Sequence, residues 1–184
     1  MSTPFEAEFV ENFLIVWDPK SGSELFKLGF YGKPLGIPKP KSPEFDVPLI
    51  LDLMEGLYLV EKGLIKVFEA PGRSVDFEDL RERARRLYED FDLKYLVYRD
   101  LREKGLVVTP GVKYGCDFAV YKRGPGIDHA PYMVSVKSWK DEISATDIVR
   151  AGRLATTVRK RFIIAVPDFE GNRIEYLIFR WFKA

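Results

Sequence analysis

YLVYRDLREKGLVVTPGVKYGCDFAVYKRG, residues 95–124, is the stretch that decides the fold. It lies partly inside an amphipathic run that starts at residue 92 and stops at Gly105, as a helix C-terminus does. Two segments rich in β-branched and aromatic residues follow, 106–111 and 114–124, and both are typical of strands. This order predicts a helix that leads directly into a sheet.

The rest of the C-terminal half continues this α and β pattern. Three more segments have strand-like composition: 131–139, 162–168 and 173–182. A helical segment, 144–161, lies between the first two and opens with a Ser-x-x-Asp cap formed by Ser144 and Asp147. We therefore expect residues 91–184 to form a mixed sheet with one buried helix.

The start of the chain reads as a β-hairpin followed by a long loop. Segments 9–19 and 23–32 are aromatic and β-branched and flank a Pro-Lys-Ser-Gly-Ser turn. Four prolines in 33–45 exclude a helix or an inner strand there, which predicts a long loop.

Two helices and a strand are expected before residue 90. Apolar residues at helical spacing predict a helix over 47–63, and a short strand follows over 64–70. Asp76 then precedes 77–91, a helix with acids in its first turn and arginines later, as the helix dipole favours. The whole chain is predicted to have an α+β fold, with a small N-terminal α/β domain over 1–90 and a C-terminal domain over 91–184.

Composition places the chain among globular proteins. It has 184 residues, of which 46% are hydrophobic, enough for one sizeable core or two small ones. No apolar run approaches the roughly 20 residues of a membrane span, and the N-terminus lacks a signal-peptide pattern, so we expect a cytoplasmic protein. The single cysteine, Cys116, excludes an internal disulfide and lies in an apolar stretch typical of a core.

Charge and amide content add two expectations. Glutamine is absent and asparagine occurs only at Asn12 and Asn172, a balance that favours a thermophilic source. The net charge is +1, but residues 1–90 carry 12 basic and 17 acidic side chains, whereas residues 91–184 carry 17 basic and 11 acidic ones. The C-terminal half is therefore where a phosphate backbone is expected to bind.

The candidate chemistry also lies in this half. The segment GPGIDHAPYM, 124–133, holds the only histidine, His129, on a turn. Tyr121 ends the preceding strand, and Lys160 belongs to a basic run at the end of the capped helix. A basic last turn is expected from the helix dipole alone, so each feature by itself is weak.

Together these motifs resemble a known family. The stretch 95–124, a His-containing segment and then AGRLATTVRKRFIIAVPDFEGN, 151–172, are similar to the catalytic domain of the archaeal tRNA-splicing endonucleases, or tRNA-intron lyases. LILDLMEGLYLVEKG, 49–63, resembles the small N-terminal domain of that family. The resemblance implies a nuclease-like C-terminal domain that cuts precursor tRNA at bulge-helix-bulge junctions.

The resemblance also assigns a catalytic triad to Tyr121, His129 and Lys160. It implies that Tyr121 is the general base, His129 the general acid and Lys160 the cation that stabilises the phosphorane. The expected products are a 2′,3′-cyclic phosphate and a 5′-hydroxyl, with no metal or other cofactor. Because a free phenol has a pKa of about 10, Tyr121 needs cations such as Lys122 or Arg123 to favour phenolate, or else it orients the 2′-hydroxyl.

RNA-holding residues follow from the same resemblance. Two arginines of the family sandwich a flipped-out base; Arg153 matches one, and Arg180 is the choice for the other, with Arg173 as the alternative. The loop 33–45 resembles an insertion of the crenarchaeal heterotetrameric type in which a lysine assists cleavage. Lys39 and Lys41 are both candidates for that lysine.

Assembly is the last expectation from the resemblance. The acidic turn Asp168, Phe169 and Glu170 matches a loop that inserts into a basic pocket of the opposing subunit. We expect an α2β2 assembly with a non-catalytic structural subunit, in preference to a homotetramer.

Two alternatives from other classes stay open. A metal-dependent nuclease of the restriction type would use Asp117 and Lys137, although Ser135 stands where its motif needs a carboxylate. The chain could instead be the non-catalytic structural subunit of the same complex, but such a scaffold has no need of Tyr121, His129 and Lys160 together.

Overall fold

The computed structural model describes residues 3–38, 40–157, 160–169, 171 and 173–179. The chain divides into two compact units, residues 1–91 and 92–184. Each unit combines helices with its own mixed sheet, which confirms the predicted fold class. Among the described residues no helix has the length and apolarity to span a membrane.

The N-terminal unit is built on a six-stranded sheet of order β3-β4-β2-β1-β5-β6. Its strands are β1 (Phe5–Val10), β2 (Phe13–Val16), β3 (Lys33–Pro34), β4 (Leu49–Leu51), β5 (Ile65–Glu69) and β6 (Arg73–Val75). β1 and β5 run parallel and the other neighbours antiparallel. The β5 strand was expected from the sequence.

The predicted hairpin between 9–19 and 23–32 is wrong in its second arm. That arm lies in a helix, α1 (Pro19–Gly29), and the hairpin instead joins β1 to β2. The Asp18 carboxylate accepts a hydrogen bond from the Ser21 N–H at 2.9 Å, and Pro19 occupies the first turn, where a missing N–H costs nothing. Local capping therefore overrides the strand-like composition.

The helix predicted over 47–63 begins later than expected. Its first part is strand β4, and the helix α2 spans Leu53–Glu61. Asp52 and Glu55 form a reciprocal capping box that fixes this start, at 2.8 and 3.2 Å. Fully buried leucines of β4 and α2 then meet in the core of the unit: Leu49, Leu51, Leu53, Leu57 and Leu59.

The helix α3 (Phe77–Leu87) begins where its charges predicted, but it ends four residues before the predicted end at residue 91. Asp76 caps it through the Asp79 N–H at 2.9 Å, and arginines occupy its last turn. Helix α4 (Phe91–Glu103) follows and ends before Gly105, as expected.

The C-terminal unit has a five-stranded sheet of order β11-β10-β9-β8-β7. Its strands are β7 (Val107–Pro110), β8 (Phe118–Tyr121), β9 (Tyr132–Val136), β10 (Arg161–Asp168) and β11 (Arg173–Phe179). β9 and β10 run parallel because the helix α5 (Ala145–Thr157) connects them, and all other neighbours are antiparallel.

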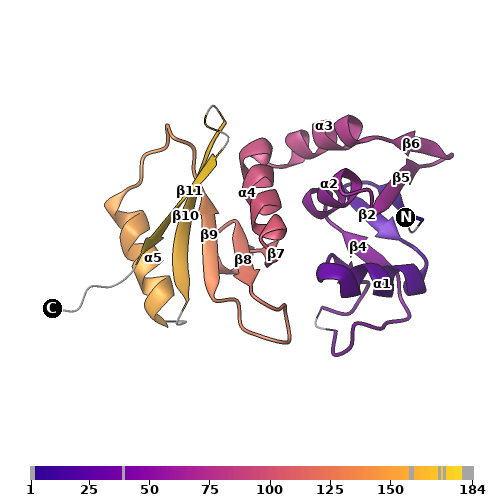
Figure 1. Ribbon diagram of the computed structural model, residues 1–184, viewed down its shortest axis with the longest axis horizontal. Helices are drawn as coiled ribbons and strands as arrows, with labels where there is room; N and C mark the ends of the chain where they lie inside the picture. The colour runs from indigo at the N-terminus through magenta and orange to yellow at the C-terminus, as the bar shows by residue number, and fades with distance from the viewer. Residues whose placement is uncertain (1–2, 39, 158–159, 170, 172, 180–184) are drawn as a thin grey trace. The chain divides into compact units, whose positions relative to one another are not determined.

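Helices pack against both faces of this sheet (Figure 1). Tyr98 of α4 lies 6.0 Å from the ring of Phe118, and the Tyr176 hydroxyl donates to Asp100 of α4 at 2.6 Å. Ala151 of α5 belongs to a core cluster on the opposite face, together with Met133.

The expectation of a buried α5 is wrong for its N-terminal turns. Residues 145–149 are exposed, including Ile148 and Val149 at 45% and 50%, whereas Ala151 is buried. The helix start is held by a reciprocal cap instead: the Asp147 N–H donates to Ser144 Oγ and the Ser144 N–H to Asp147 Oδ2, both at 3.1 Å.

Candidate active site

The strand register brings Tyr121 and Lys160 to one edge of the C-terminal sheet. Val120 pairs with Tyr132, and Tyr132 pairs with Arg161, so these three residues form a row across β8, β9 and β10. Tyr121 and Lys160 each lie one residue from this row, on the outer side of it. Two residues distant in sequence thus flank the start of β9.

The two side chains also share a face of the sheet. Ala119, Met133 and Phe162 form a row in the core cluster beneath α5. Because side chains alternate between faces, Tyr121 and Lys160, two residues from Ala119 and Phe162, lie on that same face. Tyr121 packs against the cluster and is half-buried.

His129 lies exposed in the loop that connects β8 to β9 at this edge. Its neighbour Asp128 organises the loop: the carboxylate accepts hydrogen bonds from the N–H groups of Lys122, Arg123 and Gly124 at 3.2, 3.2 and 2.9 Å. Burial alone would raise the pKa of Asp128, but these hydrogen bonds and the Arg123 charge lower it. The loop therefore holds the histidine close to the end of β8.

The surroundings of Tyr121 oppose its ionisation. Burial raises the pKa of Tyr121, and the charges of Tyr114 and Asp128 raise it further, against a hydrogen bond with Thr109 that lowers it. The free enzyme therefore holds Tyr121 as a neutral phenol at neutral pH. The cations considered from the sequence do not reverse this direction.

Lys160 is half-buried immediately before β10. Its ammonium lies 4.3 Å from the centroid of the Tyr114 ring. The Cys116 thiol lies beneath, where burial first and the charge of Asp117 second raise its pKa to about 11, while the charge of Lys160 lowers it. Cys116 is a buried, neutral thiol, as its apolar context predicted.

Sequence reasoning missed three residues of this edge. Tyr114 contacts Lys160, Thr109 lowers the pKa of Tyr121, and Asp128 fixes the histidine loop. A signal was present for two of them. Tyr114 stands between glycines at 111 and 115 in a connection between strands, and an aspartate one residue before the only histidine is a candidate to orient its loop.

Positive charge surrounds the edge. The side chains of Lys122, Arg123 and Arg161 are exposed there. A phosphate backbone approaching Tyr121 and Lys160 therefore meets basic groups from two separate segments of the chain.

The candidate base-stacking arginines lie in different parts of the C-terminal unit. Arg153 is exposed on α5. Arg173 starts β11 at the opposite edge of the sheet, where its Nε lies 3.5 Å from Asp168 and 3.4 Å from Glu175. Arg180 lies outside the described residues. Because Phe179 pairs with Phe162 near Lys160, the end of β11 is closer in register to the candidate site than Arg173 is.

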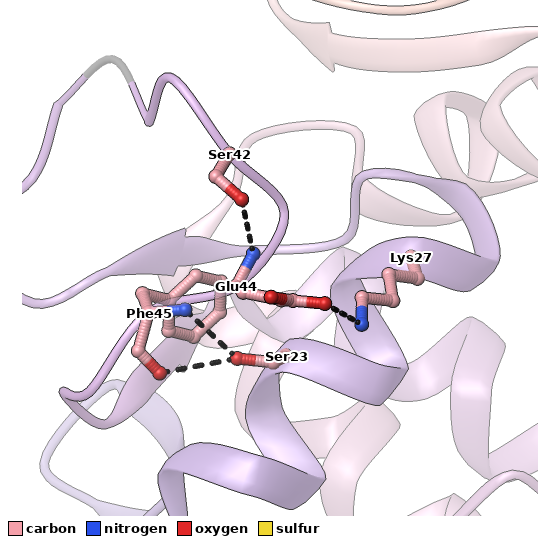
Figure 2. A network of polar contacts seen from close by, with 5 residues as sticks. All are labelled: Ser23, Lys27, Ser42, Glu44 and Phe45. Carbon is pink, nitrogen blue, oxygen red and sulfur yellow. Dashed lines mark hydrogen bonds and ion pairs between the residues drawn. The ribbon is translucent and has the colours of Figure 1, made fainter.

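The loop that carries Lys41 is anchored at its C-terminal end. Figure 2 shows Ser23 of α1 bonded to both backbone groups of Phe45, each at 3.1 Å, and Lys27 paired with Glu44 at 2.9 Å. Lys41 is exposed just before this anchor. Lys39 lies outside the described residues.

The acidic turn lies after β10. The Asp168 carboxylate accepts the Gly171 N–H at 3.0 Å, and Phe169 is 60% exposed. Glu170 lies outside the described residues. An ordered turn here presents an apolar side chain beside an acid.

Asp117 of the restriction-type alternative is engaged in the fold. Its carboxylate pairs with Lys94 at 3.1 Å and accepts the Val136 N–H at 2.8 Å. In the part of the chain that the structure describes, no group of three or more His, Cys, Asp or Glu side chains gathers as a metal site.

Comparison with known protein families defines the class. Residues 5–81 match the N-terminal domain of the tRNA intron endonucleases, and residues 91–176 match their catalytic C-terminal domain. The chain belongs to the tRNA intron endonuclease family, which confirms the resemblance seen in the sequence.

Individual relatives narrow this class to archaeal tRNA-splicing endonucleases. The chain is 50% identical over 169 residues to the tRNA-splicing endonuclease of Hyperthermus butylicus, covering 92% of this chain and 93% of the relative. It is 44% identical over 160 residues to that of Saccharolobus islandicus strain M.14.25, covering 86% and 88%. It is 42% identical over 177 residues to that of Sulfurisphaera tokodaii, covering 96% and 98%. The protein is therefore an endonuclease of the tRNA-splicing type, and removal of introns from precursor tRNA is supported.

Proposed function

We propose that this protein cuts precursor tRNA at bulge-helix-bulge junctions without a metal ion, giving 2′,3′-cyclic phosphate and 5′-hydroxyl ends. The observation that carries the proposal is the common edge at which the loop of His129 meets Tyr121 and Lys160. These residue types supply what attack by a 2′-hydroxyl requires: a proton acceptor, a proton donor and a cation beside the phosphorane.

In this scheme the 2′-oxygen attacks the phosphorus and the bond to the 5′-oxygen breaks. The 2′-hydroxyl proton passes to the small fraction of Tyr121 present as phenolate, and the imidazolium of His129 gives its proton to the departing 5′-oxygen. Lys160 balances the charge on the phosphorane oxygens. The raised pKa of Tyr121 makes this phenolate scarce at neutral pH.

RNA binding is proposed along the basic edge. Arg153 and Arg180 would sandwich a bulge base, and the placement of Arg173 at the other edge supports Arg180 over it. Lys41 or Lys39 of the 33–45 loop would assist at the scissile phosphate, and Lys41 is exposed as this role requires.

An α2β2 assembly with a non-catalytic subunit is proposed to complete the enzyme. The turn of Asp168, Phe169 and Glu170 would dock on a basic pocket of the opposing subunit, and the exposed Phe169 ring supports this role. The alternative in which this chain is itself the scaffold loses support from its match to the catalytic domain.

The test is cleavage of an end-labelled bulge-helix-bulge precursor in EDTA, by the chain alone and by its complex with the natural partner. Wild type should give cyclic-phosphate ends, and His129→Ala should lower the rate by at least about 100-fold, the contribution typical of a general acid. Lys20→Ala, an exposed change on α1, serves as the matched control. Cleavage restored only by magnesium, or equal rates for the histidine variant and wild type, would refute the proposal.

A further inference from the structure

The connection between β7 and β8 presents a tyrosine at the candidate active site. It forms one 3-10 turn, Val112–Tyr114, in which the Tyr114 N–H donates to the Gly111 carbonyl at 2.8 Å. Gly115 closes the turn in the left-handed conformation, with φ +66°, which glycine adopts without strain. The turn therefore fixes the position of the Tyr114 backbone, from which its side chain extends.

The base of this turn is tightly packed. A Cβ at Gly111 would lie 2.6 Å from Cys116 Sγ and 2.8 Å from backbone atoms of Cys116 and Phe118. The Gly111 N–H donates to the Asp117 carbonyl at 2.8 Å, which ties the two ends of the connection together. Such close packing leaves the turn little room to shift.

The Tyr114 ring lies between the core and Lys160. It packs against the cluster that contains Cys116 and Met133, and the Lys160 ammonium lies 4.3 Å from its centroid. Within the described part of the chain, no carboxylate forms an ion pair with Lys160. A ring face attracts the ammonium without using its three N–H donors, so they stay available for phosphorane oxygens.

Tyr114 also lies near Tyr121. Both rings pack against the same cluster, and the charge of Tyr114 is, after burial, the next contribution that raises the pKa of Tyr121. The two phenols therefore lie close to each other, and the Lys160 ammonium lies over the Tyr114 ring.

We propose that Tyr114 is a positioning residue of the active site, whose ring face holds the Lys160 ammonium beside Tyr121. This inference rests on the proposed function, because it gives Tyr114 a role through Lys160. The aromatic ring carries that role, so Tyr114→Phe should preserve it and Tyr114→Leu should abolish it.

The first experiment measures single-turnover cleavage in the assembled enzyme with saturating protein. Tyr114→Leu should lower the rate about three- to tenfold, as expected for loss of a partly buried cation–π contact, with RNA affinity unchanged. Tyr114→Phe should stay within about twofold of wild type. In a Lys160→Ala background, Tyr114→Leu should cause no further fall. An equal fall in both backgrounds would show that the ring acts through packing alone and would overturn the inference.

The second experiment uses NMR to detect the position of the Lys160 ammonium, independently of cleavage activity. Reductive ¹³C-methylation labels the lysine amines, and the Lys160 signal is identified by its loss in Lys160→Ala. The ring current of Tyr114 should displace this signal upfield in wild type and in Tyr114→Phe, but not in Tyr114→Leu. An undisplaced wild-type signal would overturn the inference. Normal cleavage by Lys160→Ala, with the displacement present, would instead refute the catalytic role of the lysine in the proposed function.

Discussion

At the scale of single residues, the protonation of Tyr121 is the sharpest question. Its burial and the neighbouring Tyr114 and Asp128 all raise its pKa, so a phenolate base is scarce at neutral pH. A histidine acid and a scarce phenolate base can still work together. As pH rises toward the raised pKa of Tyr121, its phenolate fraction grows about tenfold per pH unit, and a step that needs a phenolate base quickens with it.

This pairing predicts a distinctive pH profile. The single-turnover rate of wild type should not fall from about pH 7 to pH 9, because the phenolate fraction of Tyr121 grows over that range. In His129→Ala only the gain of phenolate remains, so the rate should rise about tenfold per pH unit over that range. Cleavage of labelled precursor at each pH, corrected for RNA incubated without enzyme, makes the measurement. A wild-type rate that falls above neutrality would leave Tyr121 with an orienting role only.

The residues of the candidate site show which features the sequence could predict and which it could not. Tyr121, His129 and Lys160 were found through motif resemblance, and the register places Tyr121, Lys160 and the histidine loop at one edge. Tyr114 was missed because its partner Lys160 lies far along the chain and only the packed sheet brings them together.

At the scale of elements, helix-capping residues determined where helices begin in segments whose composition fits either a helix or a strand. The strand-like composition of 23–32 gave a wrong prediction, although Asp18 and Pro19 already signalled a helix start. The helix α2 began late because Asp52 and Glu55 form a capping box inside an apolar run that fits either a helix or a strand. The helix α4, which stops before Gly105, was predicted correctly, and α3 began where its charges predicted although it ended four residues early.

The anchor of the 33–45 loop gives a prediction for an element. Ser23→Ala removes the hydroxyl that bonds both backbone groups of Phe45, so the loop end should loosen at a cost of about 1–2 kcal/mol. Amide hydrogen exchange at residues 44–46 should quicken about fivefold or more, since 1.4 kcal/mol corresponds to a factor of ten in an opening equilibrium. Ser42→Ala, which removes one exposed contact to Glu44, is the control and should have a smaller effect. Unchanged exchange in Ser23→Ala would mean that other contacts hold the loop.

At the scale of the whole molecule, both units contain weak acids that the fold keeps protonated. Burial first, then the charges of Asp52 and Glu55, raise the pKa of Tyr88 to about 12 in the N-terminal unit. In the C-terminal unit, burial and the bond to Asp100 raise the pKa of Tyr176, and the pKa of Cys116 is about 11. Each group binds its proton more tightly when folded than when unfolded.

This linkage predicts a loss of stability at alkaline pH. The contribution is fully present below the unfolded pKa values, about 8.5 for a thiol and 10 for a phenol, and is lost as pH rises toward the folded values. The Tm should therefore be constant from pH 7 to about 8.5 and fall between about pH 9 and 12. Calorimetry of wild type and Tyr176→Phe tests it: the variant should fall less steeply because one linked proton is gone. A Tm that is constant or rising over this range would contradict the prediction.

The single thiol beneath the β7–β8 connection can be used to measure local opening of this part of the protein. Cys116 Sγ lies 3.5 Å from the Gly111 carbonyl and 3.8 Å from the Met133 sulfur, so an alkylating reagent reaches it only when the connection opens. At pH 8, iodoacetamide should label Cys116 far more slowly than free glutathione, and bound precursor RNA should slow it further. Labelling as fast as that of glutathione would mean an open connection. Because the chain has no second cysteine, the ratio of the Cys116 labelling rate to the glutathione labelling rate measures the fraction of molecules in which the β7–β8 connection is open.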